Sequence, residues 1–384
     1  MKVRWRVGWF VSWIIGLALS MPVAAAQQAR LTRGPYLQST TRESVIVIWQ
    51  TDIAGDSLVE YGESGYTQAI GDTAQVTTHV IRVTGLTAGS TYLYRISTGG
   101  TVLHAATLAT APDPGGAFDF VVIGDSGHGE PTQYAVAAQM RALDPDLMLH
   151  AGDVIYPYGQ TDGYDPYFFM PYHDLLNHVP AFPSLGNHDY GTSNAQPYLD
   201  AFYLPATSSG GERYYSFDWG DAHFVALDST PPRYTDRAML RWLESDLAAS
   251  TARWKFVFFH HPMYTSGPHA SDPTVPAMHA TLEPIFVQHD VDIVFNGHDH
   301  DYERSKPQNG VIYIVTGGGG YNLYPVGTSS FTAYSASVYH AVQVQIAGCI
   351  LSLRAIDTQG KAFDQIALAK DCPYRFYLPV ILKQ

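Results

Sequence analysis

The stretch from about Leu31 to Thr110 alternates short apolar, β-branched runs with glycine-containing turns. Its clearest run, 44–51, reads SVIVIWQT, and a turn follows at 54–56. Further runs of this kind occupy 57–61, 78–83, 92–97 and 101–107. Short strands at this spacing, without helical periodicity, predict a small β-sandwich, and we place this domain at 27–112. The sequence APDPGG at 111–116 then reads as a linker.

A different pattern begins at Phe118. Continuous apolar runs at 118–123, 147–150, 254–259 and 291–295 alternate with helical patterns at 131–143, 233–250 and 276–289. Strands that are apolar on both faces and alternate with helices indicate a layered α/β domain, which we place at 117–358. Short strands return at 311–315, 340–346 and 350–356. Residues 359–384 are left as a C-terminal tail whose role the pattern does not determine.

Residues 1–26 have the pattern of a secretory signal peptide. Lys2, Arg4 and Arg6 precede an apolar stretch at 7–19, and three alanines at 24–26 offer a cleavage site. The alternative is an uncleaved membrane anchor. No other apolar run is long enough to span a bilayer, so we expect a protein that is exported from the cytoplasm, either secreted or held in the cell envelope.

Composition and charge exclude some classes of protein and partner. Hydrophobic residues make up 46% and charged residues only 15% of the 384 positions, which excludes a disordered chain. Without residues 1–26, 19 basic residues face 35 acidic ones, an excess of 16 negative charges. This argues against nucleic acid as a partner, because phosphate backbones need a basic face. An anionic substrate would require bound cations in its site.

The chain has two cysteines, Cys349 and Cys372. An even count in an exported protein predicts a disulfide between them. The alternative is a pair of free, buried thiols.

Polar side chains cluster directly after the apolar strands, where open α/β sheets place their ligand crevice. Each has a plainer explanation when taken singly, such as a Gly-Asp turn, a buried core histidine or a capping asparagine. Together they supply carboxylate, imidazole, amide and phenol donors without thiolates, a set that suits two borderline-to-hard cations sharing one carboxylate. The seven candidate ligands are Asp125, Asp153, Tyr156, Asn187, His260, His298 and His300.

Five motifs in order give the chain a family resemblance. GDxG occupies Gly124–Gly127, GDxxY Gly152–Tyr156, GNH with a following acid Gly186–Asp189, VxxH Val257–His260 and GHxH Gly297–His300. With these motifs the sequence resembles the purple acid phosphatases of the calcineurin-like metallophosphoesterase superfamily. Segments 33–38, 59–62 and 86–95 resemble the fibronectin-III-like domain of the plant-type members. The resemblance implies an N-terminal β-sandwich followed by a four-layer α/β/β/α metallophosphoesterase domain.

The resemblance also implies a ligand set. The first metal, ferric iron in the family, would be held by Asp125, Asp153, Tyr156 and His300. The second, which is zinc, manganese or ferrous iron, would be held by Asp153, Asn187, His260 and His298. The bridging ligand would be Asp153.

Four further histidines lie near these motifs. His188 is expected to face the bound phosphate, and His269 to lie near the leaving group, as the resemblance implies. Related phosphodiesterases carry a metal-binding histidine where this chain has Gly127. His128 is one position later, and we expect it at the surface or behind the ligands. For His261, a packing role and a role in the site remain open.

We therefore expect a secreted phosphatase that hydrolyses small phosphate monoesters by attack of a metal-bound hydroxide. A phosphodiesterase or nucleotide-cleaving enzyme of the same fold is the nearest alternative. A non-catalytic extracellular binding or adhesion protein is the alternative from another class, although such a protein would have no need of all seven ligands.

Overall fold

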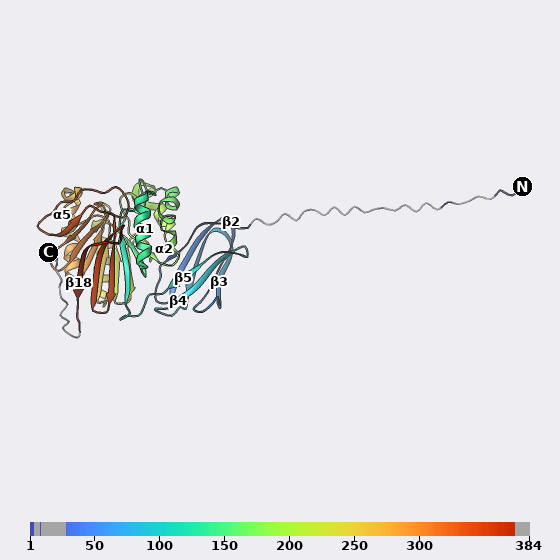
Figure 1. The fold of residues 1–384 in the computed structure, drawn as a ribbon, viewed down its shortest axis with the longest axis horizontal. Coiled ribbons are helices and arrows are strands. Elements are labelled where there is room, and N and C mark those ends of the chain that lie inside the picture. The colour runs from blue at the N-terminus through green and yellow to red at the C-terminus, as the bar shows by residue number, and fades with distance from the viewer. Residues whose placement is uncertain (4–7, 9–27, 373–384) are drawn as a thin grey trace.

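The computed structural model describes residues 1–3, 8 and 28–372 (Figure 1). Almost all of the predicted signal peptide and the end of the predicted tail lie outside the described residues. Within the described part of the chain, no helix has the length and apolar character needed to cross a membrane.

The N-terminal region is built from five antiparallel strands (Figure 1). They are β1 (Leu31–Gln38), β2 (Ser44–Gly62), β3 (Gln68–Thr84), β4 (Thr91–Thr98) and β5 (Thr101–Ala109). The sequence predicted two strands and a turn where β2 runs without a break. Its pairing with β3 shifts register around Gly55, whose missing side chain leaves room for Thr98. The glycine therefore marks a bulge within one bent strand and not a turn.

Alternating residues of these strands meet in one apolar core. Val47, Trp49 and Val59 of β2 are fully buried there together with Tyr94 of β4. A separate core with alternating inward residues agrees with the predicted sheet-rich, sandwich-like domain.

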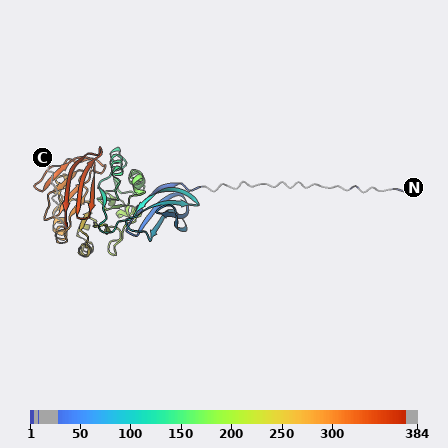
Figure 2. The ribbon, with the colours of Figure 1, turned by 60° about the horizontal axis from the view of Figure 1, so that its bottom comes forward.

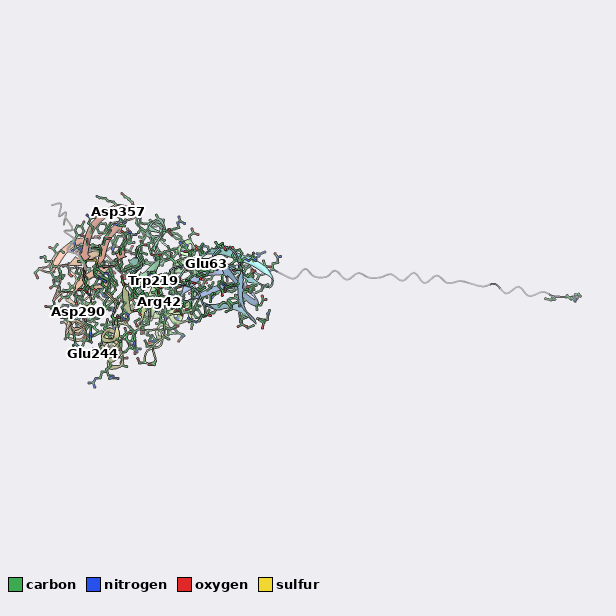
Figure 3. All side chains as sticks on the ribbon, turned by 90° about the horizontal axis from the view of Figure 1, so that it is seen from below. Arg42, Glu63, Trp219, Glu244, Asp290 and Asp357 are labelled. Atoms are coloured by element: carbon green, nitrogen blue, oxygen red, sulfur yellow. A yellow bond between two sulfur atoms is a disulfide. The ribbon has the colours of Figure 1, made fainter. Side chains whose placement is uncertain are left out.

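The sandwich is fastened to the rest of the chain by polar contacts. The Tyr36 hydroxyl donates to the Ala201 carbonyl at 2.9 Å, and the Tyr94 hydroxyl to that of Asn177 at 2.6 Å. The Arg33 guanidinium lies 4.3 Å from the Phe169 ring centroid. Figure 3 labels Arg42 close to the junction of the two parts. The two parts thus share buried, directional contacts that a loose tether would not provide.

The larger domain contains two sheets. The six-stranded sheet has the order β18-β17-β16-β6-β7-β8 and the seven-stranded sheet the order β15-β13-β14-β12-β11-β10-β9. In the first, the bounds are β6 Phe118–Ile123, β7 Leu147–His150, β8 Ala181–Pro183, β16 His340–Ala347, β17 Ile350–Asp357 and β18 Ala362–Ala369. In the second, they are β9 Tyr215–Trp219, β10 Ala222–Ala226, β11 Trp254–Phe258, β12 Ile293–Asn296, β13 Tyr302–Ser305, β14 Ile312–Thr316 and β15 Thr332–Ala336.

Aromatic side chains join the two sheets. The Phe120 ring of β6 lies 5.1 Å from that of Phe224 and 5.2 Å from that of Phe256, both edge-on. Helices carry apolar faces onto this framework. Leu243 and Phe286 belong to a second core with the seven-stranded sheet. The helices are α1 Pro131–Leu143, α2 His173–Leu176, α3 Gln196–Ala201, α4 Arg237–Ala249, α5 Thr274–Thr281 and α6 Glu283–Gln288.

Two elements differ from the sequence prediction. The helix expected over 276–289 is divided into α5 and α6, because Pro284 lacks the N–H that a continuous helix needs at that point. The predicted tail, 359–384, contains β18, which pairs with β17 (Figure 2). The six-stranded sheet thus continues past residue 358, since β17 offers an edge on which β18 pairs.

The predicted disulfide is present. Cys349, in the turn between β16 and β17, is bonded to Cys372, just after β18, with the two Cα atoms 5.2 Å apart. The bond therefore ties the last strand to the sheet.

Candidate metal centre

The predicted ligands lie at the carboxyl ends of strands from both sheets. Within the six-stranded sheet, β6, β7 and β8 are adjacent and parallel, and within the other sheet β11 and β12 are. The loops after these strands therefore open at the same end of the domain. Asp125 follows β6 and His260 follows β11, so the site lies where the two sheets meet.

Three ligand candidates have a left-handed backbone. Asp125 has a φ of +57°, Asp153 of +53° and His298 of +70°. Such values are uncommon outside glycine and cluster at functional sites, where the surrounding structure must hold them. The motif glycines make this possible, since a Cβ on Gly297 would lie 2.4 Å from Asp125 Oδ2, and one on Gly186 2.2 Å from Asp153 Oδ1.

Three potential ligand atoms surround the hydroxyl oxygen of Tyr156. Its oxygen is 2.9 Å from Asp125 Oδ1, 3.1 Å from Asp153 Oδ2 and 3.0 Å from His300 Nε2. His300 Nε2 lies 3.4 Å from Asp125 Oδ1, and its Nδ1 is held by the Asn322 carbonyl at 2.7 Å. The four atoms form a compact cluster.

A second cluster surrounds Nε2 of His260. That nitrogen is 3.2 Å from Asp153 Oδ2, 3.1 Å from Asn187 Oδ1 and 3.2 Å from His298 Nδ1. Its other nitrogen lies 3.0 Å from the Ala151 carbonyl, which orients the ring. Asp153 Oδ2 is common to both clusters.

The donor spacing fits two metal ions. With metal–ligand bonds of about 2.0–2.2 Å, neighbouring ligand atoms lie about 2.9–3.5 Å apart, depending on coordination number. The distances in both clusters lie in this range. The donors are also nitrogen and oxygen without sulfur, which suits borderline and hard cations.

Burial and neighbouring charges shift the pKa values of Asp153 and His260. Burial on its own would raise the pKa of the Asp153 carboxyl, but the neighbouring His260 holds it below its usual range. For His260, burial acts to lower the pKa, and Asp153 and Asp125 outweigh it and raise that pKa to about 9. The carboxylates at this point therefore stabilise positive charge strongly.

The same carboxylates oppose ionisation of Tyr156. Burial, followed by Asp125 and Asp153, raises the pKa of this phenol well above its ordinary value of 10. A cation bound among these groups would have the opposite effect on the phenol, because it would stabilise the phenolate and both carboxylates together.

His188 and His269 border the two clusters. His188 Nδ1 is 2.5 Å from the Pro157 carbonyl, and its Nε2 faces Asp153 Oδ2 at 3.9 Å. His269 Nδ1 lies 2.6 Å from Asp299 Oδ1, and its ring centroid is 4.0 Å from that of His298. In both rings Nδ1 is engaged in a hydrogen bond, so Nε2 is the nitrogen that can contact a substrate.

The remaining two histidines differ in position. His261 is buried, with Nδ1 3.0 Å from the Ser229 hydroxyl and its ring centroid 4.5 Å from that of His298. Burial, followed by the nearby His260, lowers the pKa of His261 to about 3, so the ring is neutral and packs behind the ligands. His128 is partly exposed and is paired with Glu130.

Sequence reasoning did not assign roles to two buried carboxylates. Asp189 accepts hydrogen bonds from the backbone of Gly186 at 2.9 Å and Val154 at 3.2 Å, which joins the loops that carry Asn187 and Asp153. Asp299 is the partner of His269. The sequence offered a signal for each: Asp189 directly follows the GNH motif, and Asp299 lies inside the GHxH motif.

Two tyrosines of one glycine-rich segment were also missed. The Tyr321 ring stacks on Tyr156 with centroids 3.9 Å apart, and Tyr324 stacks on His300 at 4.0 Å. Gly319 allows this approach, because a Cβ there would lie 2.2 Å from the Gly124 carbonyl oxygen.

Comparison with known proteins identifies the family of the chain. Residues 118–302 match the calcineurin-like phosphoesterase family. Purple acid phosphatase 4 of Arabidopsis thaliana is 26% identical over 72% of this chain and 90% of its own length. The structure of a purple acid phosphatase from yellow lupin seeds superposes with a TM-score of 0.77 at 18% identity, covering 91% of this chain and 77% of that one.

Purple acid phosphatase 17 of Arabidopsis thaliana is 30% identical over 53% of this chain and 69% of its own length. The chain therefore belongs to the purple acid phosphatase family and is a metal-dependent phosphatase of the dinuclear type.

Proposed function

We propose that this phosphatase hydrolyses phosphate monoesters with an iron-containing metal pair. Ferric iron would occupy the Tyr156 cluster, and zinc, manganese or ferrous iron the His260 cluster. The observation that carries the proposal is the shared oxygen of Asp153, which lies 3.1 Å from Tyr156 Oη and 3.2 Å from His260 Nε2. One carboxylate between two complete donor sets is the arrangement expected of a two-metal site.

The two ions, when bound, would activate water at acidic to neutral pH and neutralise the charge of the phosphoryl group. The side chains around the two clusters would position the substrate and transfer protons. Asp153 also accepts a hydrogen bond from the His188 backbone N–H at 2.8 Å, so the bridge and the histidine beside it are positioned together. His188 Nε2 is then placed to donate to a phosphoryl oxygen.

His269 is the proposed proton donor to the leaving group. The buried Asp299 carboxylate holds its Nδ1–H, which presents Nε2 outward. The Asp299 carboxylate is itself fixed by a hydrogen bond from the Thr265 hydroxyl at 2.5 Å. The donor therefore acts from a rigid support.

Substrate class is tested by rate comparison. We expect the purified protein, loaded with iron and zinc, to hydrolyse an aryl phosphate monoester at least a hundredfold faster than the matching bis-aryl diester. A preference for the diester would replace the proposal with a phosphodiesterase of the same fold.

Metal identity is tested by colour. A phenolate bound to ferric iron gives a visible charge-transfer band, so iron-loaded protein should be pink to violet. Tyr156→Phe should lose this band and keep its fold, as judged by circular dichroism. A colourless wild type with bound ferric iron, or a coloured Phe variant, would contradict the assignment of Tyr156.

The proposal also covers the folds of the two domains and the export of the protein from the cytoplasm. The N-terminal sandwich is assigned as fibronectin-III-like, and the two sheets with their flanking helices as a four-layer α/β/β/α domain. The leader at 1–26 supports export from the cytoplasm. Fractionation of the native host, followed by N-terminal sequencing of the protein, tests both export and cleavage.

A further inference from the structure

A carboxylate lies on the same short turn as the proposed proton donor. His269 belongs to the 3₁₀ turn Pro268–Ser271, and Asp272 ends it with its backbone N–H donating to the His269 carbonyl at 3.0 Å. Side chains three residues apart in a 3₁₀ turn lie on the same side of it. Accordingly, one nitrogen of His269 and one carboxylate oxygen of Asp272 lie within 4.8 Å of each other. Asp272 is therefore held beside the position of the leaving group.

The Asp272 carboxylate has no partner among the residues that the structure describes. Its Oδ2 lies 4.0 Å from His298 Nε2, which is too long for a hydrogen bond. No lysine or arginine of the described chain is paired with it, and the side chain is 41% exposed. A free negative charge thus lies at the outer edge of the second donor cluster.

An aromatic ring borders the same position. Tyr324 stacks on His300 with ring centroids 4.0 Å apart, and its centroid lies 6.0 Å from that of His269. The Gly327 N–H donates to the Ser266 carbonyl at 3.1 Å, which joins the loop of Tyr324 to the loop of His269. Aromatic rings and carboxylates both attract alkylammonium ions. The surroundings of His269 therefore have the chemistry of an ammonium site.

We propose that Asp272 and Tyr324 form a subsite for the leaving group, which takes alcohols with an ammonium group two carbons from the hydroxyl, such as choline and ethanolamine. The inference rests on the proposed function, because it uses His269 as the proton donor to the leaving oxygen. Three bonds separate that oxygen from the ammonium nitrogen, as many as one residue of extended chain spans in about 3.5 Å. This reach matches the separation of His269 and Asp272.

The subsite selects substrates by charge. Hydrolysis breaks the bond between phosphorus and the alcohol oxygen. The oxygen of water joins phosphorus, and the proton of His269 passes to the alcohol oxygen, so inorganic phosphate and the amino alcohol are released. An anionic leaving group, such as one that carries a second phosphate, is repelled by Asp272 and is a poorer substrate.

The test compares two monoesters of the same shape on the metal-loaded enzyme. Choline phosphate is one, and the other is 3,3-dimethylbutyl phosphate, in which a carbon atom replaces the charged nitrogen. The readout is the ratio of their kcat/KM values. A loss of metal or of fold lowers both rates together and leaves this ratio unchanged, because the metals act on the phosphoryl group that both substrates share. Asp272→Asn removes the charge, and Asp272→Lys reverses it. Glu244→Gln removes one charge at an exposed position of α4 and is the matched control (Figure 3).

The ratio should fall at least about fivefold in Asp272→Asn, the size of a partly exposed ion pair, and further in Asp272→Lys. Glu244→Gln should keep the wild-type ratio. Equal ratios in wild type and both Asp272 variants would overturn the subsite and leave monoester hydrolysis intact. A metal-loaded wild type that hydrolyses neither monoester would contradict the proposed function, and the subsite with it.

Discussion

Stability above neutral pH should depend on one buried histidine that lies outside the metal-binding loops. His223 lies on β10, and its side chain is only 7% exposed. Nδ1 is 2.7 Å from Asp218 Oδ1 and Nε2 is 2.9 Å from Asp246 Oδ2. Burial acts to lower the pKa of His223, but the hydrogen bonds and charges of the two carboxylates raise it from 6.5 to about 9.

The sign and size follow from linkage. Because the folded-state pKa is raised, the native protein binds a proton that the unfolded chain releases, so the contribution is complete below pH 6.5 and is lost as pH rises through about 9. At 1.36 kcal/mol per pH unit this amounts to at most about 3 kcal/mol. Asp218 is 75% exposed, so solvent screens part of the interaction and we expect about 2 kcal/mol.

The assay is urea unfolding of wild type and His223→Gln at pH 6, 7.5 and 9.5, with metal content held constant. The wild type should be the more stable protein at pH 6, and the difference should shrink by about 2 kcal/mol by pH 9.5. Arg42, Arg253 and Asp221 line the same cleft. Parallel pH profiles for the two proteins would refute the reasoning.

Three further outcomes are expected. Asp153→Asn should lose at least a thousandfold in metal affinity together with activity, since a charge pair at about 4 Å is worth about 4 kcal/mol at an effective dielectric constant of 20; full metal content with normal turnover would contradict the shared-ligand assignment. His269→Ala should slow alkyl phosphates at least about a hundredfold and aryl phosphates much less, whereas equal slowing would indicate a binding role. Cys349→Ser should lower the unfolding free energy by about 3 kcal/mol, because Cys349 and Cys372 are 23 residues apart and their bond closes a loop of that size; an unchanged urea midpoint would show that the bond adds no stability.

The metal motifs were predictable from the sequence because each is local. A strand that is buried on both faces is recognisable as an apolar run, and the residues after it must lie at the strand end. Asp125 and His300 are 175 positions apart, yet each could be placed from its own few neighbours. The pairing of the two cysteines was predictable from their number alone and is confirmed.

Strands with weak local signals were not predictable. Those that the sequence did not indicate, such as β9, β13 and β18, have mixed or polar patterns. They form because a neighbouring strand offers an unpaired edge, which is a property of the assembled sheet. Pairing with β17 decides the case of β18, and the disulfide then secures its end.

The sequence by itself determined the family and the motifs that carry the candidate ligands. Only the tertiary structure decided which side chains support those donors. The contact of Asp299 with His269 spans 30 positions, and the stacking of Tyr321 on Tyr156 joins loops of different sheets. No local pattern encodes such contacts, because they depend on how the two sheets pack.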